Sequence, residues 1–221
     1  MKRTALYISI VLVFNACKKD EFELRYKPVD KQYFSSQIGA YSIYKVHEII
    51  FDDFTNTVDT TDYQVMEVNE SHFRDNLDRD AIRIDRYRRP DDSTAWTYMN
   101  TWYAVVNNSM AERVEDNKRL VKLSFPISAE ATWNANTFNT DNANNVFYVL
   151  MHDKYKMDNF KFDSVVSVES TTRINLTVER VFKEVYAKGI GLVYKNHVNT
   201  DSGGGLKRGF KITYTLYKYG H

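Results

Sequence analysis

The chain has 221 residues, of which 43% are hydrophobic and 27% are charged, the composition of an ordinary globular protein. Lys and Arg number 30 against 29 Asp and Glu. This balance gives no basic surplus for coating phosphates and no acidic surplus for storing cations, so we expect no nucleic-acid partner. Aromatic residues make up 14%, with only three Pro and eight Gly, which favours strands over a low-complexity chain.

The N-terminus has the organisation of a secretory signal peptide. Lys2 and Arg3 precede an uncharged, mostly apolar run over residues 4–14, well short of the roughly 20 apolar residues that a membrane-spanning helix needs. Two outcomes are open after this run: cleavage and release, or lipidation at Cys17. Cys17 is the only cysteine, so it forms no internal disulfide in an oxidising compartment, and this favours lipidation.

Residues 14–17, FNAC, resemble the lipobox of bacterial lipoproteins. The resemblance implies that residues 1–16 are a signal peptide and that Cys17 carries a diacylglyceryl group together with a further acyl chain such as palmitate. Several chains on one residue give stable membrane anchoring, which a single chain does not. The implied partner is therefore the outer membrane, reached through an N-terminal lipid anchor.

The residues after Cys17 carry a second resemblance. Lys19, Asp20 and Glu21 are similar to the lysine-plus-two-acids signal that sends Bacteroidota lipoproteins to the outer face of the outer membrane. The alternative is a solvated, charged tether without an address. We expect a lipidated flexible tether over residues 17–32, followed by a single β domain over residues 33–221.

Strand patterns recur along this domain, with alternating or apolar runs separated by turn residues. Residues 41–51 and 63–68 predict one hairpin, and residues 110–125 predict another around Asp116 and Asn117. The clearest strand is the last, where four apolar side chains alternate with polar ones: Phe210, Ile212, Tyr214 and Leu216. The expected strands lie at residues 41–51, 63–68, 82–87, 96–106, 110–125, 146–151, 165–168, 174–185, 190–194 and 210–219.

For some segments the secondary structure is predicted from composition alone or is ambiguous. Residues 174–187 allow a helix or a strand, and their β-branched content favours the strand. Residues 133–145, with six Asn, and residues 199–205 predict exposed loops. Gly189 and Gly191 permit a bulge or a sharp bend.

The sequence therefore predicts an all-β, single-domain antiparallel fold, as a curved sheet, a half-barrel or a barrel of the lipocalin type. Residues 184–195, EVYAKGIGLVYK, and residues 125–133, FPISAEATW, resemble segments of uncharacterised Bacteroidota outer-membrane lipoproteins. That resemblance implies a curved antiparallel sheet like those of lipoprotein carriers, and it implies no established activity.

Signatures of chemistry are sparse. The five histidines are scattered singly, without a second cysteine or an HExxH motif, and neither a nucleophile elbow nor a phosphate loop occurs, so we expect no metal and no cofactor. A metal site assembled in space from His152, Asp153 and a distant residue is the alternative. Trp96, Tyr98 and Trp102 share one parity of a strand, so their rings either line a ligand groove or fill the core.

We expect a lipid-anchored binding or structural accessory module of the cell envelope, and no enzyme. The alternative is a small surface hydrolase that acts on glycans through two carboxylates about 5 to 10 Å apart, which needs no sequence motif. An open groove with paired acids would favour the hydrolase, and an aromatic concavity without them would favour binding.

Overall fold

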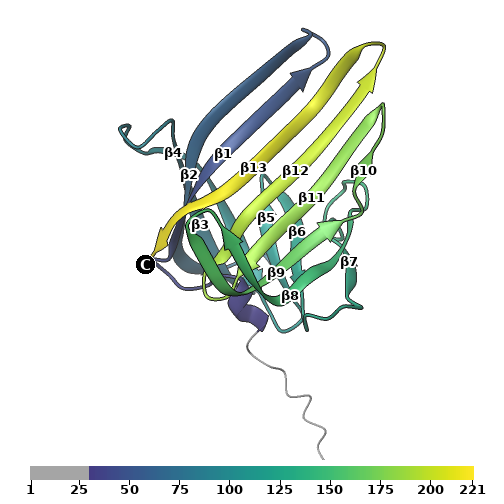
Figure 1. The fold of residues 1–221 in the computed structure, drawn as a ribbon. Helices are drawn as coiled ribbons and strands as arrows, with labels where there is room; N and C mark the ends of the chain where they lie inside the picture. Colours follow the sequence, from purple (N-terminus) through teal and green to yellow (C-terminus); the bar gives the residue numbers. More distant parts are fainter. Residues whose placement is uncertain (1–29) are drawn as a thin grey trace, which may run out of the picture.

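The computed structural model describes residues 30–221, which form one antiparallel β-sheet of thirteen strands preceded by a short 3₁₀ helix (Figure 1). This confirms the predicted all-β class. The elements in chain order are η1 (Asp30–Tyr33), β1 (Tyr41–Asp52), β2 (Thr57–Arg74), β3 (Asp80–Arg89), β4 (Thr97–Val106), β5 (Met110–Glu115), β6 (Lys118–Ser124), β7 (Thr132–Asn134), β8 (Asn145–Met157), β9 (Phe160–Ser170), β10 (Arg173–Ile174), β11 (Val178–Ala187), β12 (Gly191–Gly203) and β13 (Leu206–Gly220).

The strands form a nearly closed barrel. Their order is β6-β5-β4-β3-β2-β1-β13-β12-β11-β9-β8-β7, with β10 beside β11. The first and last strands of the chain, β1 and β13, are therefore neighbours in the middle of the sheet. The two ends of the sheet meet where the amide of Val121 donates to the carbonyl of Ala135 at 2.9 Å. Nε1 of Trp133 donates to the carbonyl of Val121 at 3.0 Å. We call this contact of β6 with β7 and the residue after it the closing junction.

The local sequence explains several of these elements. In β13, Tyr214 and Leu216 are buried, as the alternation predicts, but Ile212 is only partly buried and Phe210 is 38% exposed, so only the second half of this face belongs to the core. Residues 178–187 are a strand, β11, which resolves the helix-or-strand ambiguity in favour of the strand. Asp116 and Asn117 turn β5 into β6 with positive φ angles of 47° and 65°, a conformation that Asn and Asp adopt more readily than other side chains.

The Asn-rich segment corrects one expectation. Composition predicts an exposed loop over residues 133–145, and residues 137–143 are a mostly exposed loop, but the segment begins with part of β7 and provides the closing junction, with Ala135 only 4% exposed. Side-chain amides supply the missing backbone partners, because Oδ1 of Asn134 accepts from the amides of Asn136 and Asn144. The start of the segment is therefore structural, and its middle is the predicted loop.

The buried residues form two hydrophobic clusters, one of which includes the N-terminal end of the described chain. Tyr33 is fully buried and Phe34 is 7% exposed in that cluster. Residues 30–32, which the sequence assigns to the tether, also contact the barrel: Asp30 accepts from the amide of Ile127 at 3.1 Å, and Gln32 from the amide of Gly189 at 2.7 Å. The helix η1 thus lies against one end of the barrel (Figure 1).

The expectations on the N-terminus concern residues that the structure does not describe. The signal peptide, the lipidated Cys17 and the triplet of Lys19, Asp20 and Glu21 all lie outside residues 30–221. Within the described range there is no helix long and apolar enough to cross a membrane.

Candidate functional site

A chain of charged side chains runs through the barrel interior. Nε of Arg86 lies 3.0 Å from Oε1 of Glu67, whose Oε2 lies 2.6 Å from Nη2 of Arg113. Nε of Arg113 is 3.6 Å from Oε1 of Glu115, and the same carboxylate oxygen is 2.9 Å from Nζ of Lys122. We call the linked residues the interior ionic chain: Arg86, Glu67, Arg113, Glu115, Lys122 and Glu184.

Strand alternation places these charges inside. Glu67 follows the buried Tyr63 and Val65 on one face of β2, and Arg86 follows Ile82 and Ile84 on β3. The ring of Trp102 supports two of the cations, with Cζ of Arg86 at 3.4 Å and that of Arg113 at 4.7 Å from its centroid.

Mutual pairing keeps the interior groups charged despite burial. Burial raises the pKa of Glu67, but Arg113 and Arg86 outweigh it and hold that pKa below its ordinary value. Burial lowers the pKa of Arg113, while Glu67 and Glu115 together raise it above its usual range. These residues are therefore fixed ions at neutral pH, which suits binding better than proton transfer.

The interior ionic chain ends at Glu184, whose carboxylate has three polar neighbours. Nζ of Lys122 lies 2.9 Å and Nε2 of His197 lies 3.2 Å from its Oε1, and the hydroxyl of Tyr186 donates to its Oε2. Burial, together with the charge of Lys195, lowers the pKa of His197 to about 4, so His197 is neutral at pH 7. Burial also lowers the pKa of Lys195.

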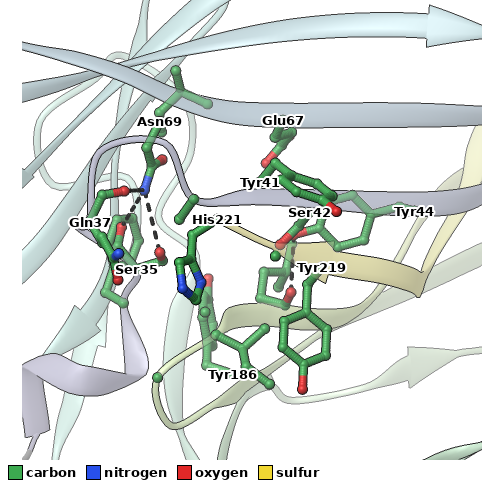
Figure 2. Close-up of a pocket in the computed structure, with 18 of the residues that line it drawn as sticks. Ser35, Gln37, Tyr41, Ser42, Tyr44, Glu67, Asn69, Tyr186, Tyr219 and His221 are labelled. Carbon is green, nitrogen blue, oxygen red and sulfur yellow. Dashed lines mark hydrogen bonds between the residues drawn. The ribbon is translucent and has the colours of Figure 1, made fainter.

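One end of the barrel is hollowed into a pocket of about 240 Å³, which we call the end pocket (Figure 2). It lies among the segment after η1, the start of β1, the end of β13 and the β11–β12 turn. At its inner end are the buried Glu67, Arg113 and Ile84. Its aromatic and polar walls include Tyr41, Tyr44, Tyr186 and Tyr219 together with Ser35, Gln37, Ser42, Asn69 and His221.

Several polar groups of the end pocket are already engaged. Nδ2 of Asn69 donates to the carbonyls of Ser35 and Gln37, the bonds drawn in Figure 2. The hydroxyl of Tyr44 donates to the carbonyl of Leu192 at 3.0 Å, and that of Tyr186 is held by Glu184. By contrast, Nε and Nη2 of Arg113 are buried without an acceptor in hydrogen-bonding geometry among the described residues.

Local backbone geometry shapes this pocket. Gly189 and Gly191, at φ angles of 79° and 99°, form the sharp bend between β11 and β12 that the sequence predicts. A Cβ on Gly191 would lie 3.3 Å from the backbone nitrogen of Ser35, so glycine lets the turn approach the segment after η1 closely.

The structure separates the three rings predicted as a ligand-lining set. Trp102 is buried in the core, whereas Tyr98 is 55% exposed and its hydroxyl lies 2.8 Å from Oγ1 of Thr101. Trp96 precedes β4 and lies under the guanidinium of Arg89. Their shared parity fails because a β-bulge inserts Met99 between the partners of Arg86 and Tyr87, which puts positions 98 and 102 on opposite faces.

His152 and Asp153, the pair considered for an assembled metal site, bond to different residues. Nδ1 of His152 lies 2.7 Å from the hydroxyl of Tyr33, and Oδ2 of Asp153 accepts from the amide of Met151. No group of three His, Cys, Asp or Glu side chains suited to a metal ion occurs within residues 30–221.

Carboxylates do not converge in the end pocket, where Glu67 is the one acidic side chain among the described lining residues. A more open depression of about 460 Å³ on the sheet surface is lined by Asp62, Asp91 and Asp92. Hydrogen bonds from Ser93 lower the pKa of Asp91, and bonds from Gln64 and Tyr217 lower that of Asp92. A glycosidase acid needs its pKa raised, the opposite direction.

No protein-family model and no curated protein matches the sequence. Two solved structures are similar to this chain. One is a candidate lipoprotein from Parabacteroides distasonis, with a TM-score of 0.47 and 10% identity. The other is a candidate exported protein with a YmcC-like fold from Bacteroides fragilis, with a TM-score of 0.39 and 12% identity. Each alignment covers 85% of this chain and 98% of the other.

Sequence reasoning missed the end pocket and the interior ionic chain. The sequence does carry a signal for the interior ionic chain, because Glu67 and Arg86 continue the apolar faces of their strands. No such signal marks the pocket, whose walls come from segments far apart in the sequence.

Proposed function

We propose that this protein is a lipid-anchored module of the cell envelope that binds a small ligand in the end pocket. The observation that carries the binding role is the pocket itself, a cavity of about 240 Å³ that reaches the buried Arg113 and Glu67. A concave site with a few convergent polar groups is the usual form of a ligand site. Beyond Arg113 the interior holds a cavity of only about 10 Å³, so the ligand binds at the end of the barrel and not within it.

The envelope location rests on the sequence of the N-terminus. We place the protein on the outer membrane, anchored through lipid on Cys17, because a short apolar run leads to the only cysteine of the chain. The triplet of Lys19, Asp20 and Glu21 would direct it to the cell surface. Residue 30 lies 13 positions after Cys17, so a fully extended tether spans at most roughly 45 Å and keeps the pocket near the membrane.

Mass spectrometry of the mature N-terminus tests the anchor. We expect a chain that starts at an acylated Cys17, and a Cys17→Ala variant that leaves the membrane fraction. An unmodified N-terminus elsewhere would refute the anchor. For surface exposure, replacement of Lys19, Asp20 and Glu21 by alanine should protect the protein from protease added to intact cells. Unchanged cleavage would contradict the export signal.

Ligand-observed NMR with a chemically mixed fragment panel tests the pocket. Ser42 faces Glu67 across the β1–β2 pair, so Ser42→Phe should fill the cavity. Thr60→Phe, at an exposed position of β2, is the matched control. We expect fragments that bind the wild type and the control but not Ser42→Phe. If no fragment distinguishes Ser42→Phe from the control, the protein has a structural role and the binding proposal is wrong.

A further inference from the structure

We propose that residues 57–62 of β2, which we call the free edge, bind an extended, positively charged peptide segment of a partner protein as an additional strand. This surface is separate from the end pocket. Residue 57 lies ten positions along β2 from Glu67, which is at the inner end of that pocket, a distance of roughly 33 Å. The two sites can therefore be occupied independently.

The free edge is a strand with a neighbour on one side only. β1 pairs with β2 from Thr57 onward, but β3 joins β2 only at Gln64, which lies opposite Arg89. Pro90 follows Arg89, and because proline lacks an N–H group and fixes its φ, it ends β3. The outer halves of β1 and β2 thus project beyond β3 (Figure 1), and every residue of the free edge is exposed.

Backbone groups of the free edge point away from β1. The amide of Asn69 donates to the carbonyl of Ala40, and the pairing of β1 with β2 then continues to Thr57 without a bulge. Hydrogen-bonding groups alternate sides along a strand, so odd-numbered residues bond to β1 and residues 58, 60 and 62 face outward. Their N–H and C=O groups can bond to an added strand, as in other cases of strand addition to a sheet edge.

The sequence of the free edge favours strand addition. Exposed edges are commonly blocked by Lys, by Pro or by a β-bulge, and residues 57–62, TVDTTD, contain none of these. Thr and Val also favour the extended backbone that a new strand needs beside it. Acidic charge is the feature that restricts which strand can pair here.

This charge selects a basic peptide over a second copy of the chain. Residues 46–63 contain no Lys or Arg, and their acidic side chains are Glu48, Asp52, Asp53, Asp59 and Asp62. Two copies paired edge to edge would bring the acidic residues of both strands together, and like charges on neighbouring strands are destabilising. Lys or Arg side chains on the added strand would instead lie beside Asp59 and Asp62.

A depression beside the free edge fits a basic side chain. It is the open depression of about 460 Å³, where Asp62, Asp91 and Asp92 face a single Lys or Arg, Lys45, among the described lining residues. Nζ of Lys45 lies 4.5 Å from the ring centroid of Tyr217. Hydrogen bonds hold the pKa of Asp91 and of Asp92 below the ordinary value, so both are ionised at neutral pH. The depression therefore has an excess of negative charge.

A second depression lies at the same end of the free edge, on the other face of β2. Its volume is about 420 Å³, and its lining includes Tyr63, Arg88 and the 41% exposed Met99. The guanidinium of Arg88 lies 3.8 Å from the ring centroid of Tyr63, whereas the next residue, Gln64, lines only the acidic depression. Successive side chains of an added strand point to opposite faces, so a basic and an apolar side chain would reach the two depressions in turn.

Fluorescence anisotropy with labelled peptides and the full-length chain in detergent tests the proposal. The probe is a heptapeptide in which Lys alternates with Val, with blocked ends. One comparison peptide has Glu in place of Lys, and another has N-methylated backbone amides, which cannot donate hydrogen bonds to a strand. We expect the Lys–Val peptide to bind at least ten-fold more tightly than either comparison peptide.

Two variants of the chain separate backbone pairing from charge. Thr60→Pro removes an outward-facing amide of the free edge, and Thr60→Ala, which keeps the amide, is its matched control. Asp62→Lys reverses a charge of the acidic depression, and Asp163→Lys makes the same change at an exposed position of β9. We expect Thr60→Pro and Asp62→Lys each to weaken binding of the Lys–Val peptide at least five-fold, and both controls to leave it unchanged.

Three results would overturn the proposal: no binding of the Lys–Val peptide, equal binding of a comparison peptide, or binding that survives both Thr60→Pro and Asp62→Lys. Sedimentation velocity adds a fourth, because a wild-type dimer that Thr60→Pro dissociates would assign the free edge to a second copy of this chain. None of these results bears on the end pocket, which the fragment experiment with Ser42→Phe tests separately.

Discussion

Nζ of Lys122 lies 2.9 Å from Oε1 of Glu184, although 62 residues separate the two in the chain. The pair joins β6 to β11 through the barrel interior, and both side chains are at least 95% buried. Removal of one partner leaves an uncompensated charge in a poorly solvated place, which costs far more than the loss of an exposed ion pair.

We therefore predict that Lys122→Met lowers the free energy of unfolding by about 3 to 5 kcal/mol. Lys118→Met is the matched control, because its ion pair with Asp141 is roughly half exposed and should matter by less than about 1 kcal/mol. Urea unfolding followed by circular dichroism measures both. Equal stability of the two variants would show that the interior pair is not coupled as described.

His197 should make stability depend on pH. Its pKa is about 4 in the folded protein against 6.5 as the ordinary value, so the unfolded chain binds more protons between these pH values. Stability is thus fully present above pH 6.5 and is lost as pH falls toward 4, by up to roughly 3 kcal/mol from this residue. Thermal unfolding from pH 7 to 4 should show the loss.

His197→Gln removes this titration, so its stability should vary less over the same pH range. His72→Gln, at an exposed position of β2, should keep the wild-type dependence. If the stability of His197→Gln falls with pH as steeply as that of the wild type, other groups cause the pH effect.

The N-terminal boundary gives a deletion test. Deletion of residues 18–29 leaves every described residue in place, whereas deletion of residues 18–33 also removes the fully buried Tyr33 and the bond from Ile127 to Asp30. We predict that the longer deletion lowers the free energy of unfolding by about 3 kcal/mol or more relative to the shorter one. Similar melting temperatures for the two deletions would contradict a structural role of η1.

Gly209 on β13 is required by a close approach of two strands. Its φ is 110°, and a Cβ there would lie 2.0 Å from the carbonyl oxygen of Asn199 on β12. Gly209→Ala should cost more than about 2 kcal/mol. A Cβ at Gly203 would meet open space, so Gly203→Ala should change the free energy of unfolding by no more than about 0.5 kcal/mol. Chemical unfolding of both variants gives the comparison, and equal costs would refute the steric argument.

Local pattern predicted much of the fold, because alternation marks strands and turn residues mark their ends. The β5–β6 hairpin at Asp116 and the buried face of β13 follow from residues close in sequence. The bulge at Met99 does not, since it depends on how β4 pairs with β3, and it separates Tyr98 from Trp102. The closing role of Ala135 likewise depends on β6 arriving beside it.

The candidate site was less accessible to sequence reasoning. Charged residues such as Arg113 and Lys122 are ordinarily exposed, and only their partners on other strands make burial tolerable. Glu67 and Arg113 lie on strands that are not neighbours, so no spacing in the sequence brings them to one pocket.

The position of β13 between β1 and β12 sets the order in which the barrel can be completed. During synthesis, β1 can pair with β2 early, but its other neighbour, β13, emerges about 160 residues later. Until then its outer edge carries unpaired backbone groups, which invite pairing with other chains. We expect the emerging chain to depend on a holding chaperone, or on rapid completion of synthesis, to fold without aggregation. The reason is that β1 gains its second neighbour only when β13 has emerged.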